Sequence, residues 1–268
     1  MQHSQKIPLI GLGTWKLKGA ECTKVVKEAL ELGYRHIDTA LAYENHKDIA
    51  KAIKDIKREE LYLTSKFSIE EVDFESCETS LDTLCSRILE ELDTEYLDLL
   101  LIHSPDHELP MEQAIFAMEK LRSKKRIKYI GVSNFTVHHM QNMIHHGAYF
   151  YCNQVEFHPY LYQKELLDYC LQHHIQVVAY RPFGKGELLQ EPLFAFLGKK
   201  YNKSSAQVIL RWLIQKNIPA IPKASSKERL KENIEVFDFT LSDTEMTAID
   251  ALHRGIRYCM PDFAEFAY

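Results

Sequence analysis

Short apolar runs recur along the chain, and longer stretches with helical spacing separate them. Eight of these runs are typical of β-strands, because each is brief, rich in large apolar residues and bounded by polar positions. They cover residues 9–13, 36–38, 61–67, 97–103, 128–133, 151–156, 176–180 and 218–221. Strands that alternate with helices predict parallel strands joined by crossover helices. We therefore expect an α/β fold, a (β/α)₈ TIM barrel, in preference to an open doubly wound sheet.

Helical periodicity is clearest between the third and fourth predicted strands. From residue 73 onwards apolar residues fall at spacings of three and four, which predicts an amphipathic helix whose apolar face packs on the barrel. They are Cys77, Leu81, Leu84, Cys85, Ile88, Leu89 and Leu92. Two later helix starts are predicted by capping boxes, in which Ser204 precedes Gln207 and Ser242 precedes Glu245.

Residues 1–268 are expected to form a single domain. No Pro/Gly/Ser-rich hinge, low-complexity tract or shift in composition divides the sequence. A chain of 268 residues could form one large α/β domain or two smaller ones, and the absence of a linker favours one.

Composition narrows the classes of partner. The net charge is −5, from 33 basic and 38 acidic residues, so the basic surface that nucleic acid or an anionic membrane requires is missing. We expect small-molecule partners, no nucleic acid and no membrane. Six scattered cysteines without a C-x-x-C pair indicate reduced thiols. With no apolar stretch long enough for a signal peptide or a bilayer span, a cytoplasmic, monomeric protein is expected.

Titratable residues stand at the ends of three predicted strands. Asp38 ends the second strand, with Tyr43 shortly after it, Lys66 lies at the end of the third and His103 at the end of the fourth. The C-terminal ends of barrel strands share one rim, so these side chains should converge. An ammonium group beside a phenol favours the phenolate, which lowers the phenol pKa and makes it a better acid. The sequence therefore predicts a proton-delivery site.

In order and spacing, these four residues resemble the tetrad of the aldo-keto reductase family. The resemblance runs from residues 9–15 to residues 237–242, and the short loops are similar to those of bacterial members such as 2,5-diketo-D-gluconate reductases. It implies reduction of aldehydes or ketones by an NADP-dependent oxidoreductase. Hydride would pass from NADPH to the carbonyl carbon while Tyr43, as general acid, protonates the oxygen. Lys66, paired with Asp38, would assist Tyr43, and His103 would orient the carbonyl.

The nicotinamide half of the cofactor site is also implied by this resemblance. A Rossmann cradle is absent, because Gly11-Leu12-Gly13 lacks the third glycine of G-x-G-x-x-G. Family members instead lay the dinucleotide across the barrel mouth. Ser133, Asn134 and Gln154 would hold the carboxamide, and Tyr180 would stack on the nicotinamide ring.

Residues 221–233 resemble the segment of the family that binds the adenosine phosphate. Lys223 and Arg229 match its 2′-phosphate ligands, which favours NADPH over NADH, because paired cations and a helix N-terminus suit a phosphate dianion. Glu232 and Asn233 match adenine contacts. Further cofactor contacts implied by the resemblance are Gly13, Thr14, Asp38, Pro182, Phe183, Ala224 and Ser225. The implied substrate contacts are Trp15, Tyr43 and His103.

The chain also departs from the family pattern. Ser68 and Ser104 stand where Trp is common, so two aromatic pocket walls are missing and an open cleft is expected. Arg181 replaces a usual Ser at a pyrophosphate contact, which its guanidinium could still serve. Only about ten residues precede Gly11, so the N-terminal hairpin of many relatives is reduced. The aromatic tail, residues 258–268, either folds over the pocket or frays.

Two other function classes stay open. One is an NADPH-binding, redox-sensing regulatory subunit with little turnover, which an activity assay would distinguish. The other, a metal-dependent barrel hydrolase, is disfavoured because no H-x-H follows the first strand. The paired histidines at 138–139, 145–146 and 173–174 lack metal-site spacing, so we predict solvated faces and no metal.

Overall fold

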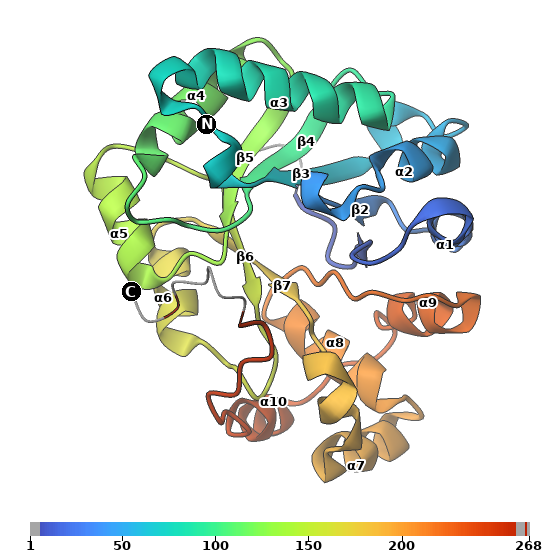
Figure 1. The fold of residues 1–268 in the computed structure, drawn as a ribbon. Coiled ribbons are helices and arrows are strands. Elements are labelled where there is room, and N and C mark those ends of the chain that lie inside the picture. Colours follow the sequence, from blue (N-terminus) through green and yellow to red (C-terminus); the bar gives the residue numbers. More distant parts are fainter. Residues whose placement is uncertain (1–5, 261–265, 267–268) are drawn as a thin grey trace.

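The computed structural model describes residues 6–260 and residue 266, and its parallel strands form a barrel surrounded by helices (Figure 1). The strands are β1 (Leu12–Gly13), β2 (His36–Asp38), β3 (Tyr62–Phe67), β4 (Leu97–Ile102), β5 (Ile127–Ser133), β6 (Cys152–Glu156) and β7 (Gln176–Tyr180). The α-helices are α1 (Gly19–Glu31), α2 (His46–Ile53), α3 (Cys77–Leu92), α4 (Met111–Ser123), α5 (Val137–His145), α6 (Lys164–Gln172), α7 (Pro192–Tyr201), α8 (Ser205–Gln215), α9 (Lys227–Ile234) and α10 (Asp243–Asp250). The 3₁₀ turns are η1 (Leu41–Tyr43), η2 (Arg58–Glu60), η3 (Ile69–Glu71), η4 (Phe74–Ser76) and η5 (Gly184–Gln190).

The strands pair in chain order from β1 to β7, and every pairing is parallel. The eighth predicted strand, residues 218–221, closes the barrel differently. Its residue Ala220 forms isolated parallel bridges to Ile10 on one side and to Ala179 on the other. Pro219 and Pro222 flank the bridge and carry no N–H, so a longer ladder cannot form. The (β/α)₈ barrel is therefore confirmed, with a bridge in place of a full eighth strand.

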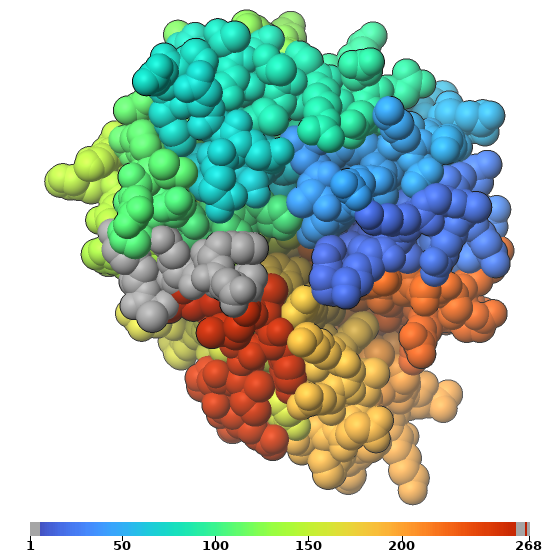
Figure 2. Space-filling view, in the orientation of Figure 1, coloured from blue at the N-terminus to red at the C-terminus, as the bar shows by residue number. Residues whose placement is uncertain are grey.

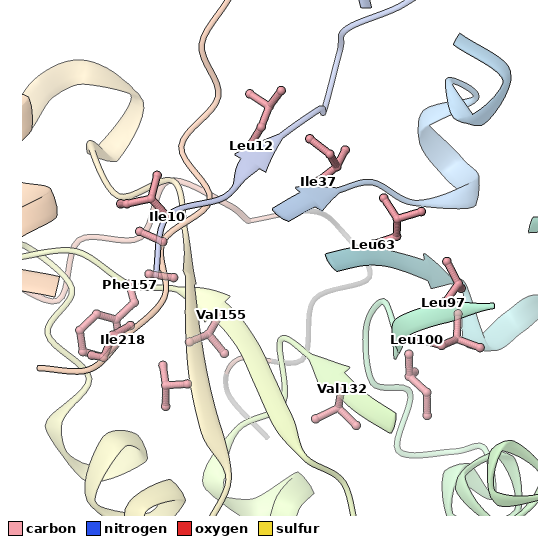
Figure 3. Close-up of a cluster of buried hydrophobic side chains, with 14 of the residues drawn as sticks. Ile10, Leu12, Ile37, Leu63, Leu97, Leu100, Val132, Val155, Phe157 and Ile218 are labelled. Carbon is pink, nitrogen blue, oxygen red and sulfur yellow. The ribbon is translucent and has the colours of Figure 1, made fainter. Parts of the chain in front are cut away.

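Side chains alternate between the two faces of the barrel wall, as the strand period of two requires. Outward residues such as Leu63, Leu100 and Val132 join the main apolar cluster between strands and helices (Figure 3). The intervening residues form a second, inner cluster with the N-terminal residue Ile7, and this cluster fills the barrel interior. Its members are Ile7, Tyr62, Leu99, Leu101, Cys152, Val178 and Ile221.

This alternation positions the polar side chains of the predicted site. Lys66, His103, Gln154 and Tyr180 lie an even number of residues beyond members of the inner cluster on the same strands or at their ends. Each therefore points into the barrel at its C-terminal end. A shift of one residue in any strand would turn its polar group towards the helices.

The two capping boxes predicted from the sequence are present at the starts of α8 and α10. In α8, the Ser204 hydroxyl accepts from the Gln207 N–H at 3.2 Å, and the Gln207 side chain accepts from the Ser204 N–H at 3.0 Å. The box at the start of α10 is confirmed as well. The helix expected from residue 73 begins at Cys77, because η4 occupies the preceding turn. Within the described residues, no helix has the length and apolar character needed to cross a membrane.

One prediction about the histidine pairs is wrong. His139 is buried, whereas its neighbour His138 and the other paired histidines are not. The His139 side chain takes part in a capping box at the start of α5, in which its Nδ1 accepts from the Thr136 N–H at 3.2 Å, and its ring packs against Phe135. Among the described residues no group of His, Cys, Asp or Glu is arranged to hold a metal ion.

Candidate functional site

The C-terminal ends of the strands open into a cleft of about 880 Å³. This volume falls within the range of small-molecule and cofactor sites. Sixteen predicted site residues line the cleft: Gly13, Thr14, Trp15, Asp38, Tyr43, His103, Ser133, Asn134, Gln154, Tyr180, Pro182, Phe183, Lys223, Arg229, Glu232 and Asn233. Three predicted residues, Lys66, Ala224 and Ser225, do not line it. Lys66 is 1% exposed and lies behind the wall, against Asp38.

A buried ion pair supports the Tyr43 side of the cleft. The Lys66 ammonium donates to Asp38 Oδ1 at 2.5 Å and to the Thr39 carbonyl at 2.9 Å. Its Nζ also lies 5.3 Å from the centre of the Tyr43 ring. Burial alone would lower the pKa of Lys66, but the Asp38 charge and Tyr43 raise it above its ordinary value. The structure therefore holds a fixed positive charge beside the phenol.

Tyr43 itself does not have the lowered pKa that the sequence predicts. Burial raises the pKa of Tyr43, and the opposing charge of Lys66 does not cancel that rise. The effect of Lys66 has the expected sign, but the cost of desolvating a phenolate is larger. Tyr43 consequently keeps its proton at neutral pH, which a general acid requires before it reacts.

His103 is held on the other side of Tyr43. The two rings meet edge to face, with centres 5.7 Å apart and planes at 71°. The His103 backbone N–H donates to Phe67 O, and its carbonyl accepts from Asn134 Nδ2, both at 2.9 Å. Burial, assisted by the Lys66 charge, lowers the pKa of His103 to about 3. The imidazole is therefore neutral near pH 7 and has one N–H to donate.

The site residues expected at the ends of β5, β6 and β7 form one hydrogen-bonded chain, in which Asn134 Nδ2 donates to Ser133 Oγ at 3.2 Å. Gln154 Nε2 donates to Asp38 Oδ2 at 2.7 Å, which links this group to the buried ion pair. The Ser133 hydroxyl donates to the backbone carbonyl of Gln154 at 2.8 Å. The Tyr180 hydroxyl donates to Asn134 Oδ1 at 2.7 Å. These contacts orient two amide groups on the cleft wall, and amides offer both a donor and an acceptor to a ligand amide.

The opposite end of the cleft is cationic. On α9, Lys227 pairs with Glu31 at 2.9 Å and Lys231 with Glu235 at 3.7 Å. Lys223 and Arg229 line the cleft, and their side chains form no ion pair within the described residues. Unpaired cations beside a helix N-terminus suit a phosphate group. The donors present therefore fit a phosphorylated dinucleotide that extends from the amide pair to α9.

The loop after β7 lies between these two ends. Arg181 has a left-handed backbone with φ of 49°, and its guanidinium lies 5.0 Å from the Trp15 ring centre. It also donates to the Tyr258 carbonyl at 2.9 Å. Gly13 lies so close to the neighbouring segment at residues 221–222 that a Cβ atom there would lie 2.6 Å from Ile221 O. A side chain at residue 13 would therefore push apart the segments that close the barrel.

The C-terminal tail forms part of the cleft wall. Tyr258, Cys259, Met260 and Phe266 line the cleft, as the hypothesis of a folded-over tail requires. The predicted tail also includes residues 261–265 and 267–268, which lie outside the described residues. Figure 2 shows the red C-terminal atoms beside the golden atoms that follow β7. Of the two serines that stand where Trp is common in the family, Ser104 lines the cleft. Ser68 caps η3 and is not among the lining residues.

Some lining residues were not assigned to the site from the sequence. They are Ala42, Pro105, Lys185, Gly186, Leu189, Ala206 and Ile221. Lys185 had a usable signal, since it is a cation just beyond a strand end. The apolar lining residues had no such signal in the sequence, because only the barrel geometry distinguishes an apolar residue of the cleft wall from one of the core.

Three histidines with lowered pKa values should make the protein less stable below neutral pH. Burial lowers the pKa of His36 to about 4, of His103 to about 3 and of His46 below its ordinary value. In the unfolded chain histidine titrates near about 6.5. Between these values the unfolded state binds more protons, so the free energy of unfolding falls as the pH falls from about 7 towards 4.

Urea titrations at several pH values across this window check the expectation. His36→Asn, which removes one titrating group outside the cleft, should make the decline shallower. An unfolding free energy that stays constant from neutral pH to about pH 5 would contradict it.

Comparisons with known proteins show the family to which the chain belongs. The sequence model of the Aldo/keto reductase family matches residues 9–254. The chain is 41% identical to glyoxal reductase of Bacillus subtilis (strain 168), covering 96% of this chain and 93% of that protein. Aldose reductase from Schistosoma japonicum has a TM-score of 0.90 at 32% identity, covering 97% of this chain and 93% of that one. A protein assigned as 2,5-diketo-D-gluconic acid reductase B has a TM-score of 0.91 at 33% identity, covering 96% and 92%.

Proposed function

The chain belongs to the aldo/keto reductase family, and from this premise we propose that it is an NADPH-dependent oxidoreductase that reduces aldehydes or ketones to alcohols. The observation that carries the proposal is the arrangement around Tyr43. Tyr43 keeps its proton, its ring centre lies 5.3 Å from the buried ammonium group of Lys66, and its ring meets the neutral ring of His103 edge to face. That arrangement suits proton donation to an oxygen that gains negative charge.

The proton transfer follows from these groups. A substrate carbonyl oxygen beside Tyr43 would accept hydrogen bonds from the phenol and from the His103 N–H. NADPH, when bound, supplies the hydride that reduces the carbonyl carbon. As charge develops on the oxygen, the Tyr43 hydroxyl gives up its proton to it, and the phenolate left behind is stabilised by Lys66. Asp38 keeps Lys66 protonated and in place.

The cofactor would be held by residues of the same cleft. Ser133, Asn134 and Gln154 would bind the carboxamide, Tyr180 would face the ring, and Lys223 and Arg229 would bind the phosphate on the adenosine. The support is the chain of oriented amides at one end and the unpaired cations at the other. The remaining proposed contacts are Gly13, Thr14, Pro182, Phe183, Glu232 and Asn233, which line the cleft, and Ala224 and Ser225, which do not.

A substrate panel tests the proposed function. Purified protein is mixed with NADPH and with glyoxal, methylglyoxal, aromatic aldehydes or sugar-derived ketones, and the loss of reduced nicotinamide absorbance is followed. Because glyoxal reductase is among the relatives, small α-dicarbonyls belong in the panel. Turnover of at least one carbonyl is expected. Tight NADPH binding without turnover of any carbonyl would favour the regulatory-subunit alternative.

Arg229→Ala should weaken the use of NADPH much more than that of NADH. A guanidinium bound to a phosphate dianion contributes a charge-assisted hydrogen bond, which NADH cannot form because it lacks the 2′-phosphate. We expect the Michaelis constant for NADPH to rise by about ten- to a hundredfold, since such a bond contributes about 1.5–3 kcal/mol.

Lys231→Ala provides the matched control, because Lys231 is a cation on the same helix that pairs with Glu235 and does not line the cleft. Steady-state kinetics with both nucleotides should show no change in this control. Equal increases for NADPH and NADH in Arg229→Ala would remove the proposed phosphate contact.

A further inference from the structure

Glu156 is a fully buried carboxylate that the proposed chemistry does not use. It ends β6 and is 0% exposed. A buried carboxylate is costly unless hydrogen bonds compensate for lost hydration. Glu156 has three such bonds, from His158 Nε2 at 3.0 Å, from the Tyr258 backbone N–H at 2.8 Å and from the Cys259 backbone N–H at 2.7 Å. Two of the three donors thus belong to the C-terminal tail.

The tail segment concerned, residues 257–260, is called the C-terminal strap below. Besides the bonds to Glu156, the strap is held by contacts nearer the surface, among them the bond from Arg181 to the Tyr258 carbonyl. Arg257 donates to Gln163 Oε1 at 3.0 Å, and the Tyr258 hydroxyl donates to Glu187 Oε2 at 2.8 Å. Gln163 in turn donates to the Glu156 carbonyl at 2.7 Å. Glu156 is therefore the buried centre of the strap's attachment to the barrel.

The charge of Glu156 makes this attachment strong. Burial by itself raises the pKa of Glu156, but hydrogen bonds from His158 and from the strap lower it below its ordinary value. The carboxylate consequently stays ionised at neutral pH, and hydrogen bonds to an ionised acceptor are about twice as strong as neutral ones. The two strap N–H groups are adjacent in sequence, and each binds a different oxygen of Glu156. One carboxylate thus fixes both the position and the direction of the strap.

The fixed strap forms part of the cleft wall near the proposed acid. Tyr258, Cys259 and Met260 all line the cleft that contains Tyr43 and Trp15. Figure 1 shows the tail returning from α10 to the ends of β6 and β7. A wall held by a buried carboxylate limits the size of ligand that the cleft accepts, because moving the wall would break those hydrogen bonds.

We propose that Glu156 is a positioning residue that holds the C-terminal strap as a wall of the substrate cleft and so makes the enzyme favour small carbonyl substrates over bulky ones. This inference rests on the proposed carbonyl reduction. Glu156 acts through the strap and takes no part in proton transfer. Its loss should therefore change substrate preference more than the rate of the chemical step.

Glu156→Gln is the first test. The amide keeps the shape of the side chain, but its NH₂ group faces a strap N–H that needs an acceptor, so one of the two bonds is lost. We expect the ratio of kcat/KM for a bulky aromatic aldehyde to that for glyoxal to rise by about tenfold, the lower end of the change that loss of one hydrogen bond to a charged group produces. The change should lie mainly in KM, with kcat for glyoxal within about twofold of wild type.

Two further variants separate positioning from general destabilisation. Asp98→Asn alters another fully buried carboxylate, which binds Arg58 and the Leu63 N–H away from the cleft lining. It should leave the substrate ratio unchanged. A chain that lacks residues 257–268 but keeps Glu156 should show a rise in the ratio at least as large, because the wall itself is gone. Adding Glu156→Gln to that chain should change nothing more, because the residue acts only through the strap.

Amide hydrogen exchange of residues 257–260 gives a readout independent of turnover. Exchange there should be faster in Glu156→Gln than in wild type or Asp98→Asn, and an equal rate would overturn the anchoring role. Carbonyl turnover with an unchanged substrate ratio in Glu156→Gln would overturn the role in selectivity. If wild type reduces no carbonyl, the proposed function and the selectivity role both fail, while the exchange rates still decide the anchoring.

Discussion

Replacing Tyr43 with Phe should lower kcat for carbonyl reduction by about 10²–10⁴-fold, the usual contribution of a general acid. The variant keeps the ring that packs against His103 and removes only the hydroxyl that donates the proton. Affinity for NADPH should stay within about twofold of wild type, because the phenol acts on the reacting carbonyl and makes no ground-state contact that binding requires. Steady-state kinetics and nucleotide binding monitored by protein fluorescence measure the two quantities separately.

Tyr62→Phe is the matched control for Tyr43→Phe. Tyr62 is also a buried phenol on the inward face of the barrel, but it belongs to the inner cluster, and its hydroxyl has no hydrogen-bond partner among the described residues. Removing that hydroxyl should leave kcat unchanged. If Tyr43→Phe retained near-native turnover, the assignment of Tyr43 as the acid would be wrong.

The sequence was most informative where several physical signals coincide. Strand ends could be read from apolar runs, and the barrel gives those ends a shared rim, so Asp38, Tyr43, Lys66 and His103 could be brought together before any coordinates. The resemblance to a family added the cofactor residues, and most of these line the cleft. The eighth strand was predicted as regular because apolar residues surround Ala220, although the neighbouring prolines allow only a bridge.

Other features depend on energies that a sequence pattern does not contain. The pKa of Tyr43 is a balance between a nearby charge and burial, and the sequence showed the charge but gave no measure of the burial. Glu156 stands at a strand end like the proposed catalytic residues, so its position in the sequence could not show whether it is catalytic or positions another segment. Its partners Tyr258 and Cys259 lie 102 and 103 positions away, and only the folded chain brings them to it.

Replacing Lys66 with Met should reduce both stability and activity. The substitution leaves the Asp38 carboxylate buried with Gln154 as its remaining side-chain partner among the described residues. Breaking one side of a buried ion pair costs about 3–5 kcal/mol, so the free energy of unfolding in urea should fall by that amount. Activity should fall by about 10²–10³-fold, because the cation that stabilises the Tyr43 phenolate is gone.

The double variant Asp38→Asn/Lys66→Met separates these two effects. Neutralising both partners removes the uncompensated charge, and neutral replacement of a whole buried pair is often close to neutral for stability. The amide oxygen that Asp38→Asn introduces can still accept the hydrogen bond that Gln154 Nε2 gives to Asp38. Urea unfolding should therefore show most of the lost stability restored, while kcat stays as low as in Lys66→Met. A positive charge that only satisfies Asp38 becomes unnecessary once that carboxylate is neutralised, whereas a positive charge that stabilises the Tyr43 phenolate is still required. If turnover recovered together with stability, Lys66 would therefore serve the fold alone.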